Sequence, residues 1–217
     1  MNVLLLRLTG PMQAWGAQSR FGVRDTGREP SKSGVIGLLA AALGRPRHAS
    51  ITDLAALRMG VRVDREGTLL RDYHTAQNVY RAKGGTKETE LSTRYYLADA
   101  AFLVGLEGDQ DVLRKVHAAL RNPQWALFLG RRAFVPGQPI WLEDGLRAGM
   151  LEEQLHPNVS PWIKGEPRTF PLVRMVIEDK TGNEVRPDQP LSLDPRRYAP
   201  RRVINEYRNV EYRCTRD

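Results

Sequence analysis

The sequence of 217 residues contains one cysteine, Cys214. A single cysteine excludes a disulfide framework and an all-cysteine zinc site within one chain, and it fits a reducing cytoplasm. Histidine is also scarce: the four histidines have none of the spacings typical of metal ligands. We therefore expect neither a bound metal nor a cofactor.

Long apolar runs are missing as well. The longest run, residues 35–43, is far shorter than the roughly 20 residues that cross a bilayer, so no membrane partner is expected. The first eight residues lack the layout of a signal peptide, because Arg7 interrupts a very short apolar stretch. No internal repeat or low-complexity block is visible. These features predict a soluble cytoplasmic protein that is long enough to bury a core.

Arginine is what the sequence has in excess. Lysine and arginine total 33 against 25 acidic residues, which gives a net charge of +8, and arginine outnumbers lysine by 27 to 6. The corresponding pI is about 9.9. Such a surplus predicts a nucleic acid or another polyanion as partner. A GC-rich genome, which enriches arginine, is the alternative explanation.

The apolar pattern predicts an α+β fold. Strands are expected at residues 3–8, 61–64, 100–106 and 125–129, with helices from about 31 to 43 and from 109 to 121. This order is the ferredoxin-like, RRM-type pattern, an antiparallel sheet with two helices on one face and the other face free for a ligand. Residues 1–142 are expected to form this domain.

Two further segments complete the predicted organisation. Residues 65–97 are polar, carry Gly84-Gly85, and are expected to form a thumb-like β-hairpin arm inserted in the domain. Residues 143–217 are rich in proline and predict a small, irregular C-terminal extension, in which short strands near 172–177 and 203–207 are expected.

The loop from residue 9 to 33 is the strongest candidate for nucleic-acid contact. It combines glycines, an indole, several cations and a helix N-terminus whose amides favour a phosphate. The alternative is that Trp15 anchors the core and Ser31 is only a helix cap. The candidate RNA-binding residues of this loop are Gln13, Trp15, Arg20, Arg24, Arg28, Lys32 and Ser33.

The arm and a later turn add further candidates. Cations interleaved with tyrosines suit a single strand, because charges bind phosphates and rings stack on bases. The alternatives are a solvated hairpin and, for the turn, structural ion pairs. The candidates in the arm are Arg71, His74, Arg81, Lys83, Lys87 and Arg94, and those in the turn after Gly130 are Arg131 and Arg132.

Five motifs together resemble one protein family. They are L-R-L-T-G-P-M-Q-A-W-G at 6–16, P-S-K-S-G-V-I-G-L-L-A-A-A-L-G at 30–44, L-R-D-Y-H-T at 70–75, D-A-A-F-L-V-G-L-E-G at 99–108 and L-G-R-R at 129–132. In combination they resemble the CasD subunits of type I-E CRISPR Cascade complexes, which belong to the repeat-associated mysterious protein (RAMP) superfamily.

The resemblance implies a non-catalytic RNA-binding subunit for antiviral defence. It would bind the 5′ handle of the CRISPR RNA (crRNA), cap the filament of backbone subunits and contact the neighbouring backbone subunit and the large subunit. Target DNA would be reached only indirectly, because guide–target pairing searches the sequence.

The alternative from the residues is a metal-independent endoribonuclease that processes CRISPR precursor RNA. His74 is its general acid or base, with Tyr73 beside it. In type I-C systems the similar subunit cuts with a Tyr, Lys and His set, but no spacing in this sequence maps onto that set. A general RNA chaperone without a fixed partner is a third interpretation.

Overall fold

The computed structural model describes residues 1–16, 22–156 and 172–209. Arg20 and Cys214 lie outside these ranges. The described strands are β1 (Asn2–Thr9), β2 (Met12–Gln13), β3 (Val23–Arg24), β4 (Arg58–Arg65), β5 (Thr68–Tyr80), β6 (Thr86–Ala98), β7 (Ala101–Gly108), β8 (Trp141–Ala148), β9 (Leu172–Glu178), β10 (Glu184–Leu193) and β11 (Arg196–Asn209). The described helices are α1 (Lys32–Ala42), α2 (Thr52–Ala55), α3 (Gln110–Arg121) and α4 (Leu151–Gln154).

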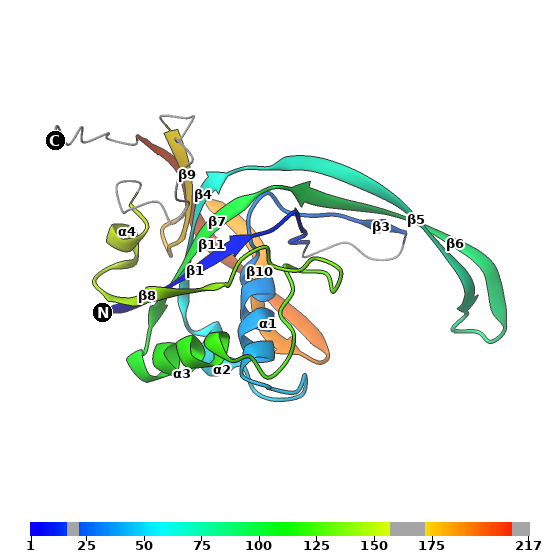
Figure 1. Ribbon diagram of the computed structural model, residues 1–217, viewed down its shortest axis with the longest axis horizontal. Coiled ribbons are helices and arrows are strands. Elements are labelled where there is room, and N and C mark those ends of the chain that lie inside the picture. The colour runs from blue at the N-terminus through cyan, green and yellow to red at the C-terminus, as the bar shows by residue number, and fades with distance from the viewer. Residues whose placement is uncertain (17–21, 157–171, 210–217) are drawn as a thin grey trace.

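A seven-stranded sheet forms the body of the protein (Figure 1). Its strand order is β10-β11-β9-β4-β7-β1-β8, and every pairing in it is antiparallel. The predicted α+β class, with a mostly antiparallel sheet and few helices, is confirmed.

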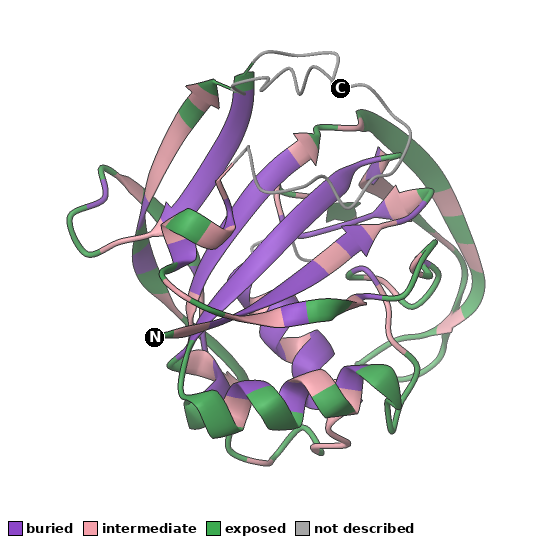
Figure 2. Cartoon of the chain, turned by 60° about the vertical axis from the view of Figure 1, so that its left-hand side comes forward, coloured by how far each residue is buried: buried purple, intermediate pink, exposed green. Residues whose placement is uncertain are grey.

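Both faces of this sheet are covered. Along β1, Leu4 and Leu6 join the larger core cluster with α1 and α3, whereas Val3 and Leu5 join a second cluster with Leu151 of α4. This alternation follows from the two-residue period of a strand. The central strands are accordingly buried along most of their length (Figure 2).

The second core cluster corrects one prediction. The face opposite α1 and α3 is not free for a ligand over β1, β4 and β7, because α4 lies there. Gly60 and Gly105 permit this approach: a Cβ at either position would lie 2.5–2.6 Å from a leucine methyl group of Leu155 or Leu151. Two strand glycines thus mark the place where a one-turn helix packs.

The two long helices begin at the expected caps. Ser31 Oγ accepts a hydrogen bond from the backbone of Gly34 at the start of α1, and Asp109 caps α3 in the same manner. Gly44, with φ of +68°, follows the C-terminus of α1. Side-chain capping and a left-handed glycine explain why the sequence located these helices well.

The strand predicted at residues 125–129 is wrong. These residues form a loop that packs against the C-terminal end of α1, where Trp125 N–H donates to Ala41 O. The edge strand beside β1 is β8, which begins at Trp141. The short apolar run at residues 125–129 packs the loop against the helix. The spacing of its apolar residues alone does not distinguish such a loop from a strand.

The segment after residue 142 is also more regular than expected. The predicted boundary at 142/143 falls inside β8, and β9, β10 and β11 extend the same seven-stranded sheet. The prediction of an irregular extension is therefore wrong for residues 172–209 apart from two short turns. Prolines are tolerated in β10 because it is an edge strand, where an absent N–H breaks no ladder.

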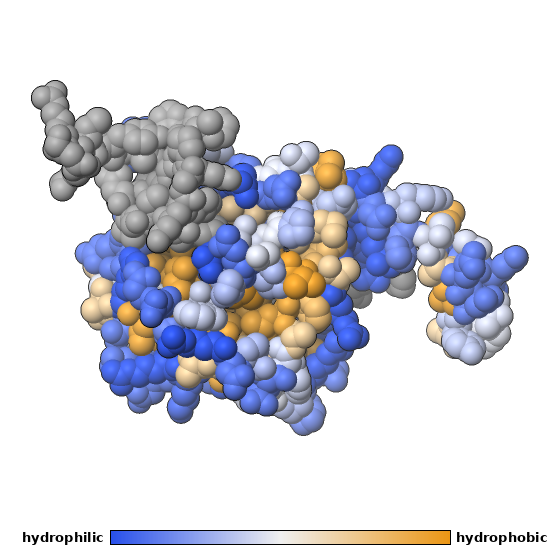
Figure 3. Space-filling model, in the orientation of Figure 1, coloured by the Kyte–Doolittle hydropathy of each residue, from blue (hydrophilic) through white to orange (hydrophobic). Residues whose placement is uncertain are grey.

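A second sheet projects from the body. It contains β5 and β6 as a long antiparallel hairpin, with β2 and β3 paired to the basal part of β6. The hairpin occupies residues 68–98, where the sequence predicts an inserted arm, and its distal part stands apart from the body with a mostly hydrophilic surface (Figure 3). The basal strands place residues of the N-terminal loop beside it.

Candidate nucleic-acid interface

Gln13 and Trp15 are core residues, with 0% and 3% of their surface exposed. Gln13 Nε2 donates to Ala100 O at 2.8 Å and to Leu8 O at 3.2 Å, and its Oε1 accepts from Trp15 Nε1 at 3.1 Å. A buried amide with its polar groups paired has nothing to offer a base edge. The structure therefore corrects their predicted role from RNA contact to support of the loop.

The N-terminus of α1 is occupied by the protein's own carboxylate. The backbone N–H of Lys32 donates to Asp188 Oδ2 at 2.7 Å, beside the Ser31 cap. Asp188 is buried and comes from β10, far along the chain. The helix end thus binds an anion as expected, but the anion is internal, which corrects the prediction of a phosphate there.

Lys32 is likewise removed from solvent. Its side chain is 1% exposed, and Nζ donates to both carboxylate oxygens of Glu178 at 3.0 and 2.9 Å. Burial lowers the pKa of Lys32, and Glu178 opposes that shift. Lys32 is therefore a structural cation and not an RNA contact. The neighbouring Ser33 is half-buried, 3.5 Å from Ser31 Oγ.

The turn at Gly130 rests directly on the N-terminal loop. Ala14 N–H donates to Leu129 O at 3.1 Å, and Leu129 N–H donates to Phe134 O at 2.8 Å. Gly130 has a φ of +94°, and a Cβ there would lie 1.8 Å from Ala14 O. Only glycine fits this approach. The loop built by Gln13 and Trp15 therefore fixes where the next residue, Arg131, points.

Arg131 reaches across to β3. Its Nη2 donates to the carbonyl oxygens of Arg24 (3.2 Å) and Asp25 (3.4 Å), and its guanidinium lies 5.5 Å from the ring centre of Phe134. Phe134 in turn packs against Tyr96 of β6, with ring centroids 5.8 Å apart. Arg131 thereby joins the turn to the basal hairpin.

Three of the predicted cations gather at this point. Arg24 of β3 is paired in register with Arg94 of β6, and Arg94 is paired with Asp72 of β5. Burial lowers the pKa of Arg131, and the charges of Arg94 and Arg24 lower it further, against Asp72 and Asp25. Three arginines against two carboxylates leave this region with an excess of positive charge, which favours an added anion. We call Arg24, Arg94 and Arg131 the basal arginine cluster.

Most of the remaining hairpin candidates lie further out. His74 Nδ1 is 3.8 Å from Asp72 Oδ2, and Lys87 pairs with Glu90. Arg81 and Lys83 are exposed near the tip. Arg71 is exposed at the base of the hairpin, where its cross-strand partner is Tyr95.

Tyr73 and His74 point to opposite faces of the hairpin, because consecutive residues of a strand alternate. Tyr73 is 64% exposed, and its cross-strand partner is Thr93. His74 faces Ser92 on the other side of the ribbon. The two groups proposed for an endoribonuclease therefore do not converge on one phosphate.

Arg28 and Arg132 are exposed and follow members of the basal arginine cluster in the chain, Arg24 and Arg131 respectively. The carbonyl oxygen of Arg28 accepts from Arg174 Nη2 at 3.1 Å, while its own guanidinium is on the surface. Arg132 follows Arg131 in the turn. Arg20 lies outside the described residues.

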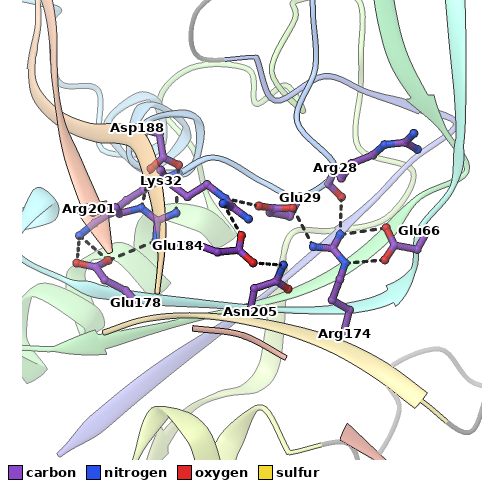
Figure 4. Close-up of polar contacts among 11 residues, drawn as sticks. Arg28, Glu29, Lys32, Glu66, Arg174, Glu178, Glu184, Asp188, Arg201 and Asn205 are labelled. Atoms are coloured by element: carbon purple, nitrogen blue, oxygen red, sulfur yellow. Dashed lines mark hydrogen bonds and ion pairs between the residues drawn. The ribbon is translucent and has the colours of Figure 1, made fainter. Parts of the chain in front are cut away.

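Sequence reasoning missed the residues that hold this region together. Arg174, Arg186 and Arg201 come from the C-terminal strands and pair with carboxylates near the N-terminal loop and α1 (Figure 4). Their only signal in the sequence was the general richness in arginine. Register across distant strands, which a single sequence does not reveal, brings each arginine to its carboxylate.

The described residues contain neither a cluster of metal ligands nor a membrane-spanning helix. Within residues 1–16, 22–156 and 172–209, no three potential metal ligands among His, Cys, Asp and Glu come together. In the same ranges, no helix is both long and apolar enough to cross a membrane.

Comparison with known proteins places this fold in a family. The model of the CRISPR-associated protein (Cas_Cas5) family matches residues 3–211. The CRISPR system Cascade subunit CasD of Escherichia coli (strain K12) is 38% identical over 157 residues, which are 65% of this chain and 70% of that protein.

Solved structures agree over nearly the full length. A protein described as a Cas protein is 44% identical, with a TM-score of 0.79 over 96% of this chain and 95% of its own. A chain of a CRISPR RNA-guided surveillance complex is 36% identical, with a TM-score of 0.82 over 96% of this chain and 90% of its own. Sequence and structure lead to the same result: this chain belongs to the CRISPR-associated Cas_Cas5 family.

Proposed function

We propose that this protein is a non-catalytic subunit of a CRISPR RNA-guided surveillance complex, Cascade, in which it binds the 5′ handle of the crRNA and caps the backbone filament. The observation that carries the proposal is the basal arginine cluster, which lies where the hairpin joins the body. Family membership and the likeness to a chain of a surveillance complex support it. The site of action is the cytoplasm.

The topology supports a RAMP-type assignment. Within the large sheet, β8, β1, β7 and β4 are neighbours in that order, with α1 following β1 and α3 following β7. This is the strand order of a ferredoxin-like, RRM-type unit. The hairpin inserted between β4 and β7 then corresponds to the thumb-like arm.

The RNA would be held chiefly through its backbone. Guanidinium groups form bidentate contacts with phosphates and accept several orientations of a flexible strand. Phosphate contacts set register without reading sequence, so base recognition falls to other groups. The exposed ring of Tyr73 and the cross-strand pair of Arg71 and Tyr95 offer stacking and charge on the other hairpin face.

The same layout suggests where the protein partners bind. The distal hairpin, with Arg81 and Lys83 exposed near its tip, reaches away from the body toward the neighbouring backbone subunit. The large subunit is the second protein partner. Target DNA is met through guide pairing within the assembled complex and not by this chain directly.

Affinity for handle RNA measured against salt tests the binding. For a single strand, the slope of log K against log salt is about −0.7 for each phosphate neutralised. Replacing Arg24, Arg94 and Arg131 with Gln should reduce that slope by about 2. The matched control replaces Arg114, Lys115 and Arg147 with Gln, because it removes equal charge from α3 and β8. Equal slopes in both variants would overturn the assignment.

A cleavage assay tests the absence of catalysis. End-labelled CRISPR repeat RNA is incubated with the protein in EDTA and run on a denaturing gel, with a native gel to confirm binding. We expect bound, intact RNA. A discrete product that disappears in His74→Ala would establish the endoribonuclease instead, and one that persists in that variant would place the cleavage elsewhere.

A further inference from the structure

Arg174 of β9 connects three parts of the chain. It is 8% exposed, and its guanidinium donates to both oxygens of Glu66, through Nε at 2.7 Å and Nη2 at 3.0 Å. Nη1 donates to Glu29 Oε2 at 3.0 Å, and Nη2 also donates to Arg28 O at 3.1 Å. Figure 4 shows these acceptors arranged around the single guanidinium.

The acceptors belong to the elements that carry the basal arginine cluster. Glu66 lies in the turn from β4 to β5, which is the base of the hairpin. Arg28 and Glu29 lie in the segment that follows β3, four and five residues after Arg24. Arg174 therefore ties the hairpin base to the segment behind Arg24, and both are anchored to the large sheet through β9.

The network continues into the last hairpin of the chain. Glu29 Oε1 accepts from Arg186 Nε at 2.9 Å, Arg186 Nη1 donates to Glu184 Oε2 at 2.8 Å, and Glu184 accepts from Asn205 Nδ2 at 3.0 Å. Burial lowers the pKa of Arg174, but the hydrogen bonds and charges of Glu66 and Glu29 outweigh it, so the pKa stands above its ordinary value. The guanidinium is held charged.

These contacts are unsuited to direct RNA binding. Two carboxylates and a carbonyl already take the donors of Arg174, and a phosphate would have to displace a carboxylate from a largely buried site. Removing the guanidinium would leave Glu29 with Arg186 and would remove the hydrogen bonds from Arg174 to Glu66. The bridge between the hairpin base and the segment after β3 would then be lost.

We propose that Arg174 is a positioning residue for the RNA site, which holds Arg24 and Arg94 in register by bridging Glu66 and Glu29. The proposal rests on the proposed RNA binding and assigns a role in it to a strand near the C-terminus. Holding the cations in place before binding reduces the conformational entropy that is lost when RNA binds, and this strengthens the affinity.

The test compares Arg174→Met with Arg208→Met. Arg208 is the matched control because the carboxylate with which it pairs, that of Glu206, lies in its own strand. With handle RNA as the probe, we expect Arg174→Met to weaken binding about tenfold and Arg208→Met to leave it unchanged. Hydrogen exchange should rise in residues 22–30 and 66–70 of Arg174→Met only.

A double-mutant comparison separates positioning from contact. In a protein that already carries Arg24→Gln and Arg94→Gln, Arg174→Met should cause no further loss of affinity, because the groups that it positions are gone. A further loss of similar size would overturn the proposal and make Arg174 a direct ligand.

Arg174→Lys provides a second test in case Arg174→Met does not fold. It keeps the charge and loses the bidentate geometry, so we expect a folded protein with an intermediate loss of affinity and intermediate exchange. Full affinity in folded Arg174→Lys or Arg174→Met would overturn the inference alone. A wild-type protein that does not bind handle RNA would overturn the proposed function itself.

Discussion

At Gly130 the backbone requires a glycine, and the next residue is Arg131 of the proposed RNA site. Its positive φ and its approach to Ala14 O leave no room for a side chain. We expect Gly130→Ala to lower the free energy of unfolding by about 2–3 kcal/mol, from backbone strain and displacement of the turn. Urea denaturation measures this loss, and RNA affinity should fall with it.

Gly84 supplies the control for that prediction. It has a φ of +88°, but a Cβ there would meet nothing within 4 Å. Gly84→Ala should therefore cost only the backbone strain, about 1 kcal/mol. Equal losses in the two variants would show that the contact with Ala14 does not position the turn.

Residue-level prediction failed for burial, and the RNA contacts of the exposed candidates stay a prediction. Arg24, Arg94 and Arg131 come from distant parts of the sequence and lie together, whereas Gln13, Trp15 and Lys32 are inside. Residue type indicates what a side chain is able to bind. Its availability depends on tertiary partners such as Ala100 O and Glu178, and a local pattern does not identify those partners.

At the scale of elements, the proposed function assigns RNA binding to the base of the hairpin and subunit assembly to its distal part. Its distal strands pair only with each other, so their removal exposes no core. We expect a variant in which Asn-Gly replaces residues 78–88 to keep its unfolding midpoint and its affinity for handle RNA. It should fail to join the backbone subunit in a pull-down of reconstituted complex.

The control for the shortened hairpin keeps its length and replaces Arg81 and Lys83 with Ser. Partial assembly in this control would assign part of the contact to charge and the rest to reach. Full assembly of the shortened protein would contradict the proposed role of the distal hairpin.

The ion pair between Arg58 and Glu152 of the short helix α4 makes the free energy of unfolding depend on pH. The hydrogen bond from Arg58 lowers the pKa of Glu152 from its ordinary value of 4.5. Because the folded-state pKa is depressed, this stabilisation is complete above the unfolded-state value and disappears as the pH falls through the folded-state value. Glu152→Gln should be less stable than wild type at pH 7, and the difference should shrink as the pH falls through the lowered folded-state pKa of Glu152.

Denaturant titrations across pH 3–7 check this expectation. Glu143→Gln is the control, since Glu143 is exposed on β8. A stability difference for Glu152→Gln that does not shrink as the pH is lowered would show that packing, and not the ion pair, accounts for its effect.

Element prediction was accurate where local chemistry determines the answer. Ser31 and Asp109 marked the starts of α1 and α3, and the apolar runs marked β1 and β7. It failed at residues 125–129 and in the proline-rich C-terminal part. Packing against α1 decides the structure of residues 125–129, and pairing with strands far away in the chain decides that of the C-terminal part. Period and proline content are poor guides to either.

At the scale of the whole molecule, the arginine surplus has two separate uses. Arginines of the C-terminal strands neutralise internal carboxylates and join β9, β10 and β11 to the N-terminal loop and α1. The basal arginine cluster is the part of the surplus that the proposed function assigns to RNA. Net charge alone does not distinguish these two groups of arginines.

The most direct measurement is the affinity of the purified protein for crRNA 5′-handle RNA and for a scrambled RNA of equal length and composition, in EDTA at fixed salt. The account predicts tighter binding of the handle, recovered intact, and weaker binding of both RNAs when Arg24, Arg94 and Arg131 are replaced with Gln. Equal affinity for both RNAs, or a cleaved handle, would contradict it.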